Sequence, residues 1–276
     1  MSEEVWRRLL TAAGALFLVL FSLAPFLFML LVSASGRPDF LTESVPFSVT
    51  LEHYARVLAA AELHFPRYLL NSCVVSLAAA AAAVLVASLA AYALTRLPVP
   101  SKMALLFGVL ALSMFPQVSL VGHLFKMMSA LHWINTYQAL ILPYAAWVLP
   151  LSVWIMVSYF LQIPRDLDRA AQVDGCSHLQ VLARVLLPVA RPGLFAVFLL
   201  AFIFCFNEFM FALMLTRDAA ARTVPVGIAL FEGLHGETPW GTIMAASAVT
   251  TVPVVAVTVA FQRHIISGLT RGAVKG

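Results

Sequence analysis

The sequence predicts an all-α integral membrane protein with six transmembrane helices, and three observations lead to this fold class. Hydrophobic residues make up 62% of the 276-residue chain and charged residues only 11%, against roughly half and a quarter in soluble domains. Long stretches of the chain contain no Asp, Glu, Lys or Arg. Lipid offers no hydrogen-bond partner to backbone N–H and C=O groups, so these long stretches are expected to form helices, which satisfy their own backbone groups. The composition therefore argues against disorder, a disulfide scaffold and a water-soluble enzyme.

The charge-free stretches give the boundaries of the predicted helices, because about 20 apolar residues in a helix cross the hydrocarbon core. The predicted spans are 11–33, 69–95, 103–125, 138–160, 194–216 and 242–262. The alternative for the first span is a signal peptide, with Arg7 and Arg8 as its basic segment. Its apolar run is longer than the about 7–15 residues of such a peptide, so we expect a retained helix.

Lys and Arg are distributed unevenly among the predicted loops. With the N-terminus in the cytoplasm, eleven of the 17 basic residues lie in cytoplasmic segments and six lie outside. Such an excess marks the cytoplasmic side, and an even number of spans places both termini there. We expect one transmembrane domain, 1–276, with two long external segments, 34–68 and 217–241, and one long cytoplasmic segment, 161–193.

The long cytoplasmic segment has the pattern of a helix, a tight turn and a second helix. Pro164 favours a first helical turn, and Asp174-Gly175 is typical of a helix end. Ser177 begins a second helix, with a glutamine three residues later as its capping-box partner, and Pro188 is expected to end that helix. Helix–helix connections usually take about 2–8 residues, so we expect a functional loop whose apolar residues need a partner surface.

This loop resembles the EAA loop of permeases in ABC importers. The resemblance in the loop rests on Ala170-Ala171, Asp174-Gly175, Leu187-Pro188 and Pro192. Other parts are similar to carbohydrate importers, in particular to the second permease subunit of maltose-type systems. These parts are Phe115-Pro116, Ile141-Leu142-Pro143-Tyr144, Asn207-Glu208 and the C-terminal stretch 268–276. The chain departs from the family pattern at Arg169, where Glu is usual, and at Cys176, where Ala is usual.

The resemblance implies that the coupling loop, 164–192, fits into a cleft of a separate ATPase. The contact residues it implies are Asp168, Arg169, Ala170, Ala171, Asp174, Gly175, Cys176, Leu179, Leu182 and Pro188. The alternative interpretation is an amphipathic helix that lies on the bilayer surface.

The chain itself has no ATP site, because a P-loop needs Gly-Lys-Ser/Thr and none of the three lysines follows a glycine. We therefore expect no enzymatic activity and no cofactor or metal bound by this chain. The resemblance implies ATP and Mg on a dimeric ABC ATPase, a homologous second permease and an extracytoplasmic sugar-binding protein, in a bacterial plasma (inner) membrane. Basic residues do not cluster with aromatic residues, so we expect membrane lipid but no nucleic acid as a partner.

Glu208 is the only acidic residue within a predicted span. Such residues usually face the bundle interior or a water-filled path, and the neighbouring Asn207 adds an amide suited to sugar hydroxyls. Asn207, Glu208 and Phe206 are therefore the candidate substrate-pathway residues. The alternative is a structural Glu208 that pairs with a polar residue of a neighbouring helix.

We therefore expect the chain to be a permease subunit of an ATP-driven importer that carries a di- or oligosaccharide into the cytoplasm. A permease for another polar solute, such as glycerol phosphate, is one alternative, although the predicted spans contain no Lys or Arg. An ion-coupled secondary transporter is another, and it predicts several intramembrane charges. An intramembrane enzyme would need paired catalytic groups, and Glu208 has no acidic or His companion in its span.

Overall fold

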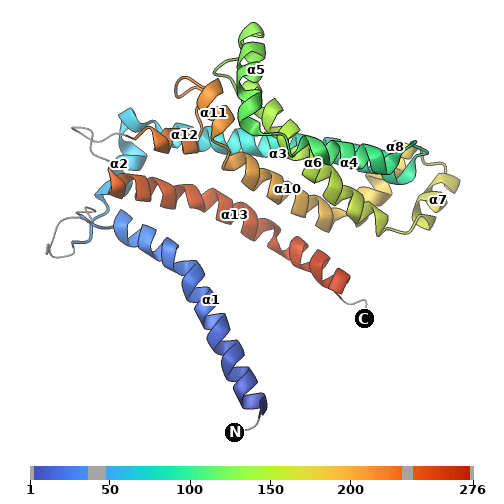
Figure 1. The fold of residues 1–276 in the computed structure, drawn as a ribbon, viewed down its shortest axis with the longest axis horizontal. Helices are drawn as coiled ribbons and strands as arrows, with labels where there is room; N and C mark the ends of the chain where they lie inside the picture. Colours follow the sequence, from blue (N-terminus) through green and yellow to red (C-terminus); the bar gives the residue numbers. More distant parts are fainter. Residues whose placement is uncertain (1–2, 37–47, 232–238, 274–276) are drawn as a thin grey trace. The chain divides into compact units, whose positions relative to one another are not determined.

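The structure is a computed structural model, and it describes residues 3–36, 48–231 and 239–273. Within these ranges all the regular elements are helices, and the one β-bridge, between Ser35 and Val49, is isolated. The chain forms two compact units, 1–66 with 227–252 and 67–226 with 253–276. Figure 1 traces the helices in chain order. The prediction that 1–276 is a single domain stays a prediction.

The first unit contains α1 (Glu3–Ser33), α2 (Glu52–Ala59), η1 (Ala61–Leu63) and the beginning of α13 (Trp240–Ala273). Most apolar side chains of α1 are exposed, as expected of a helix that faces lipid. Its C-terminal end is held by α2, where Tyr54 Oη lies 2.7 Å from Ser33 Oγ. His53 Nε2 lies 3.0 Å from the Ser35 carbonyl, and Gly241 leaves room for the His53 ring.

The second unit is a helical bundle built on α3 (Phe65–Arg96) and α6 (Tyr137–Leu161). Packed with them are α4 (Lys102–Leu112), α5 (Gln117–Ala130), α10 (Arg191–Phe206), α11 (Met210–Leu215) and the beginning of α12 (Val224–Ala229). Helices α6 and α10 lie side by side (Figure 1), because Gly193 allows the Tyr159 ring to pack directly on the α10 backbone. Small residues at such contacts let membrane helices approach closely.

Four of the predicted spans each lie within one helix. Span 11–33 lies in α1, 69–95 in α3, 138–160 in α6 and 242–262 in α13. These four helices are long and apolar enough to cross a membrane. The number rises to six if each of two bent helix pairs in the described part of the chain counts as one span; these pairs are α4 with α5, and residues 178–189 with α10.

The predictions of continuous helices over 103–125 and 194–216 are wrong. The first of these helices is interrupted between α4 and α5, and the chain bends by 85° from one helix to the other. Pro116 causes this break, because it cannot donate a backbone hydrogen bond and it disfavours helical geometry at the residue before it. The second break separates α10 from α11 at residues 207–209, where Glu208 is placed.

Gly193→Ala is expected to destabilise the bundle, because the added Cβ would lie 2.5 Å from Cγ of Tyr159. Overpacking of this kind costs about 1–3 kcal/mol, so the midpoint of thermal unfolding in detergent should fall. Gly108→Ala is the matched control, since nothing lies within 4 Å of a Cβ at that position. Equal midpoints for the two variants would contradict the packing assigned to α6 and α10.

Candidate functional site

The predicted helix–turn–helix is present in the coupling loop. Helix α7 (Asp166–Val173) is followed by Gly175, whose φ of 86° is a backbone conformation that glycine adopts without a steric cost. Helix α8 (His178–Val181) begins with the predicted capping box. The Gln180 N–H donates to Ser177 Oγ at 3.4 Å, and the Ser177 N–H donates to Gln180 Oε1 at 2.8 Å. These local features of the prediction are confirmed.

The second helical segment ends at Val189, one residue after the predicted end at Pro188, but it reaches this end through a turn that was not predicted. The chain continues from α8 through a wider π-type turn, η2 (Leu182–Leu186), into α9 (Leu187–Val189). In η2 the Leu187 N–H donates to the Leu182 carbonyl, five residues earlier. Pro188 has no N–H for the residue four positions before it, and the wider turn accommodates this loss. The chain then bends by 83° into α10.

The loop has one buried face and one exposed face. Ala171, Val181, Leu182 and Leu186 pack in a core cluster with side chains of α3 and α6. Val173 and Leu179 point away from that cluster and are 87% and 67% exposed.

The ten implied contact residues divide between these two faces. Asp168, Ala171 and Leu182 are buried and Cys176 is half-buried. The exposed members are Arg169, Ala170, Asp174, Gly175, Leu179 and Pro188. The exposed set is therefore available to a partner, whereas the buried set holds the loop to the bundle.

A buried ion pair connects α7 to the end of α3. Arg96 Nε lies 2.6 Å from Asp168 Oδ2, and the two side chains are 5% and 10% exposed. Burial raises the pKa of the Asp168 carboxyl, and the positive charges of Arg96 and Arg165 offset part of that increase. Arg96 was not predicted from the sequence as the partner of Asp168, because the two residues are far apart in the chain.

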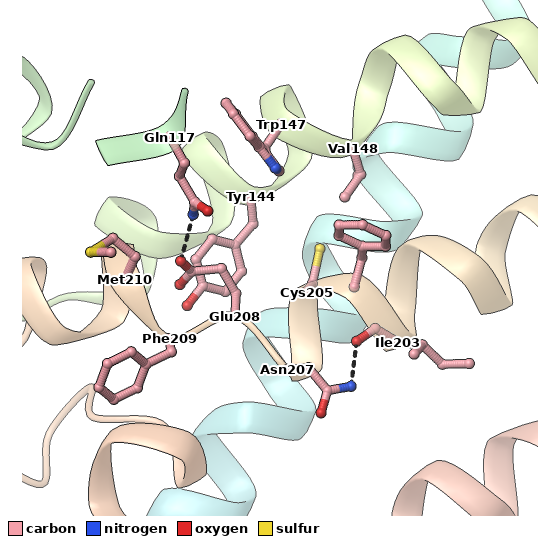
Figure 2. A pocket seen from close by; sticks show the side chains of 11 residues that line it. Gln117, Tyr144, Trp147, Val148, Ile203, Cys205, Asn207, Glu208, Phe209 and Met210 are labelled. Carbon is pink, nitrogen blue, oxygen red and sulfur yellow. Dashed lines mark hydrogen bonds between the residues drawn. The ribbon is translucent and has the colours of Figure 1, made fainter. Parts of the chain in front are cut away.

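A pocket of about 520 Å³ lies where the two helix breaks meet. Its polar and aromatic lining residues, drawn in Figure 2, include Gln117, Tyr144, Trp147, Asn207 and Glu208. Gln117 is the first residue of α5, and Asn207 and Glu208 lie between α10 and α11. Gln117 and Trp147 were not predicted as site residues from the sequence. Pro116 could have indicated Gln117, because a proline in a predicted span favours a helix break at that point.

The Glu208 carboxylate joins the two broken helices. Its Oε1 accepts hydrogen bonds from Gln117 Nε2 at 2.7 Å (Figure 2) and from the Phe211 N–H at 2.8 Å. Its Oε2 accepts from the Ala212 N–H at 3.1 Å. The carboxylate thus satisfies two N–H groups that the first turn of α11 leaves without helical partners, while it also lines the pocket.

The other two candidate pathway residues lie in different surroundings. Asn207 is exposed, and its amide nitrogen donates to the Ile203 carbonyl at 2.8 Å. Phe206 is buried in the core, with its ring centroid 5.5 Å from that of Phe202, and it is not among the residues that line the pocket. Phe206 therefore lies outside this pocket, and its place in the substrate pathway stays a prediction.

Buried polar residues also hold the segment that follows α11. The Asn71 amide donates to the carbonyls of Ala219 and Arg222 at 3.1 and 2.8 Å. Tyr137 Oη donates to Asn71 Oδ1 at 2.6 Å, and the Val224 N–H donates to Ser72 Oγ at 2.8 Å. Asn71 was not singled out from the sequence, although a fully buried amide in an apolar span usually has such partners.

The second unit thus has a bundle with broken helices, a pocket at the breaks and a helical loop with an exposed apolar face. The family model for the binding-protein-dependent transport system inner membrane component matches residues 83–271. The chain belongs to this family, and it is a multi-pass protein of the inner membrane. Within the described residues, no three His, Cys, Asp or Glu side chains are grouped so as to hold a metal ion.

Two relatives show how far the sequence similarity extends. The chain is 52% identical over 277 residues to the trehalose/maltose transport system permease protein MalG of Thermococcus litoralis, and the match covers 100% of both chains. It is 40% identical over 233 residues to the trehalose transport system permease protein SugB of Mycobacterium tuberculosis, covering 84% of each.

The fold is similar to that of a chain in a bacterial ABC transporter that imports the acidic polysaccharide alginate. The TM-score is 0.75 at 21% sequence identity, with 95% of this chain and 98% of the other covered. This similarity supports the all-helical membrane fold.

Asn71→Ala is expected to lower stability, because it leaves two backbone carbonyls and the Tyr137 hydroxyl without a partner. Buried unsatisfied groups cost about 1–3 kcal/mol, so thermal unfolding should begin at a lower temperature and proteolysis within 217–223 should accelerate. Ser158→Ala is the control, since Ser158 is exposed and its hydroxyl donates to the Trp154 carbonyl of the same helix. Unchanged proteolysis of Asn71→Ala would show that Asn71 does not hold this segment.

Proposed function

We propose that the chain is a permease subunit of an ATP-driven importer that moves a sugar, a di- or oligosaccharide, into the cytoplasm. The observation that carries the proposal is the full-length 52% identity to a permease named for trehalose and maltose. The pocket supports a neutral substrate over a phosphorylated one, because Lys and Arg are absent from its described lining. This favours a sugar over glycerol phosphate.

Both termini lie in the cytoplasm in this proposal. The support is the distribution of basic residues, eleven in the segments that would be cytoplasmic and six in the others. The coupling loop is then on the side where ATP is available. Arg96, at the end of α3, would lie near the cytoplasmic surface of the membrane.

The exposed face of the coupling loop binds a separate, dimeric ABC ATPase that carries ATP and Mg. Exposed Leu167, Val173 and Leu179 provide apolar contact area, and Gly175 permits the turn between α7 and α8. A homologous second permease completes the membrane part, and an extracytoplasmic sugar-binding protein delivers the substrate. Closure of the ATPase moves the loop and shifts the bundle between outward-facing and inward-facing states.

The pocket at the helix breaks is part of the sugar pathway. Its volume lies within the about 300–1,000 Å³ typical of small-molecule sites. The Glu208 carboxylate and the Asn207 amide can accept hydrogen bonds from sugar hydroxyls, while Trp147 offers an aromatic face. Because Glu208 also joins α5 to α11, a change in the angle between the broken helices would reshape the pocket.

The first test is affinity purification of the tagged protein in mild detergent, with mass spectrometry of the proteins that co-purify. A stoichiometric P-loop ATPase together with a second permease is the expected result. A chain that purifies alone, under conditions that preserve complexes, would favour the ion-coupled secondary transporter instead.

Gly175→Pro is expected to uncouple sugar uptake from ATP hydrolysis. Proline holds φ near about −65°, whereas Gly175 has a φ of 86°, so the turn between α7 and α8 must change. The reconstituted complex should still insert and hydrolyse ATP, but sugar uptake should fall by about tenfold or more. Normal uptake would contradict the coupling role, and Gly122→Ala, which meets nothing within 4 Å, is the control.

Glu208→Gln is expected to reduce uptake more than assembly. Glutamine has one acceptor oxygen, so it cannot keep all three hydrogen bonds at full strength, and it removes the charge that faces the pocket. The measurement is sugar uptake per assembled complex, with the KM and the maximal rate determined separately. Normal uptake by a complex that assembles poorly would assign Glu208 a structural role alone.

A further inference from the structure

Three elements of the second unit meet at one side chain, Arg96, the last residue of α3. Its Nε lies 2.6 Å from Asp168 Oδ2 in α7. Its Nη2 donates to the Phe160 and Ile163 carbonyls at the end of α6, at 3.1 and 2.8 Å. One guanidinium therefore binds the two long helices and the coupling loop at the same time.

Two further contacts also connect the coupling loop to the end of α3. Arg165, directly before α7, donates through Nη2 to the Thr95 carbonyl of α3 at 2.9 Å. Tyr92 Oη lies 3.2 Å from His178 Nδ1, which connects α3 to the first residue of α8. Both halves of the helix–turn–helix are thus attached to the same end of α3.

The environment of the Arg96–Asp168 pair distinguishes it from the other ion pair of the loop. Asp166 and Arg169 are 3.5 Å apart with both side chains exposed, and such pairs contribute little because water screens them. The Arg96–Asp168 pair is buried. A buried ion pair is a poor source of net stability, but removal of one partner leaves an uncompensated charge.

We propose that Arg96 and Asp168 are positioning residues that lock α7 to the ends of α3 and α6, so that the coupling loop and these two helices move as one body. The inference rests on the proposed function, in which an ATPase moves the exposed face of the loop. The buried pair then transmits that movement to α3 and α6. Without the pair, the remaining contacts of the loop hold α7 less rigidly, and less of the movement reaches α3 and α6.

The experiment compares Asp168→Asn, Arg96→Gln and the double variant in the complete importer reconstituted in vesicles. The measured quantity is the amount of sugar imported per ATP hydrolysed, and each single variant should lower it by about tenfold. The double variant leaves no unpaired buried charge, so it also tests whether a folding defect explains the single variants. Because the two residues act as a pair, its effect should be no larger than that of either single variant.

A local measurement separates positioning from general stability. Hydrogen exchange of the amides in 166–173 should become faster in each variant, while exchange within 72–90 of α3 stays unchanged. Arg8→Gln is the matched control, because it removes an arginine from an exposed ion pair with Glu4. This control should leave both the sugar-to-ATP ratio and the exchange of α7 unchanged.

The outcomes distinguish the inference from the proposed function. A normal sugar-to-ATP ratio, or unchanged exchange in α7, would overturn the positioning role. Uptake and ATP hydrolysis could also both fall by the same factor as the amount of folded complex. That result would overturn the positioning role and assign the two residues a structural role. A wild-type protein that neither assembles with an ATPase nor imports sugar would overturn the proposed function, and the exchange experiment would still decide whether Arg96 and Asp168 hold α7.

Discussion

A membrane-spanning backbone must satisfy its own hydrogen bonds, since lipid provides no partner for them. At the first break the N–H groups of Ser113, Met114 and Phe115 donate to carbonyls three residues earlier. At the second break the Glu208 carboxylate accepts the N–H groups of Phe211 and Ala212. The breaks are therefore possible because tight turns and one carboxylate replace the helical hydrogen bonds that they remove.

In the proposed function the same carboxylate also connects this constraint to transport. Because Glu208 also accepts a hydrogen bond from Gln117, the beginnings of α5 and α11 are held together beside the pocket. The structural and pathway interpretations of Glu208 are thus compatible. A residue that holds two broken helices together and lines the pocket between them is well placed to respond when the helices move, which is what the proposed alternating access requires.

The coupling loop has two faces with different surroundings: one packs on the bundle, and in the proposed function the other binds a partner. Its inner face is apolar and contains a buried ion pair, while Val173 and Leu179 remain exposed. The separation explains why neighbouring residues differ in role. Asp168 faces Arg96 and is buried, whereas Arg169 is exposed at the position where the family pattern has Glu.

The sequence by itself determined the fold class, four continuous spans, the Gly175 turn and the Ser177 capping box, because these depend on hydropathy and on neighbours within about four residues. Only the tertiary structure decided the partners of Glu208, Asp168 and Asn71. Gln117 is 91 residues from Glu208, and Asn71 is 148 residues from Ala219. Contacts over such separations depend on how the helices pack, which local patterns do not specify. The wider turn at Leu182–Leu186, just before Pro188, was likewise not specified by the local sequence pattern.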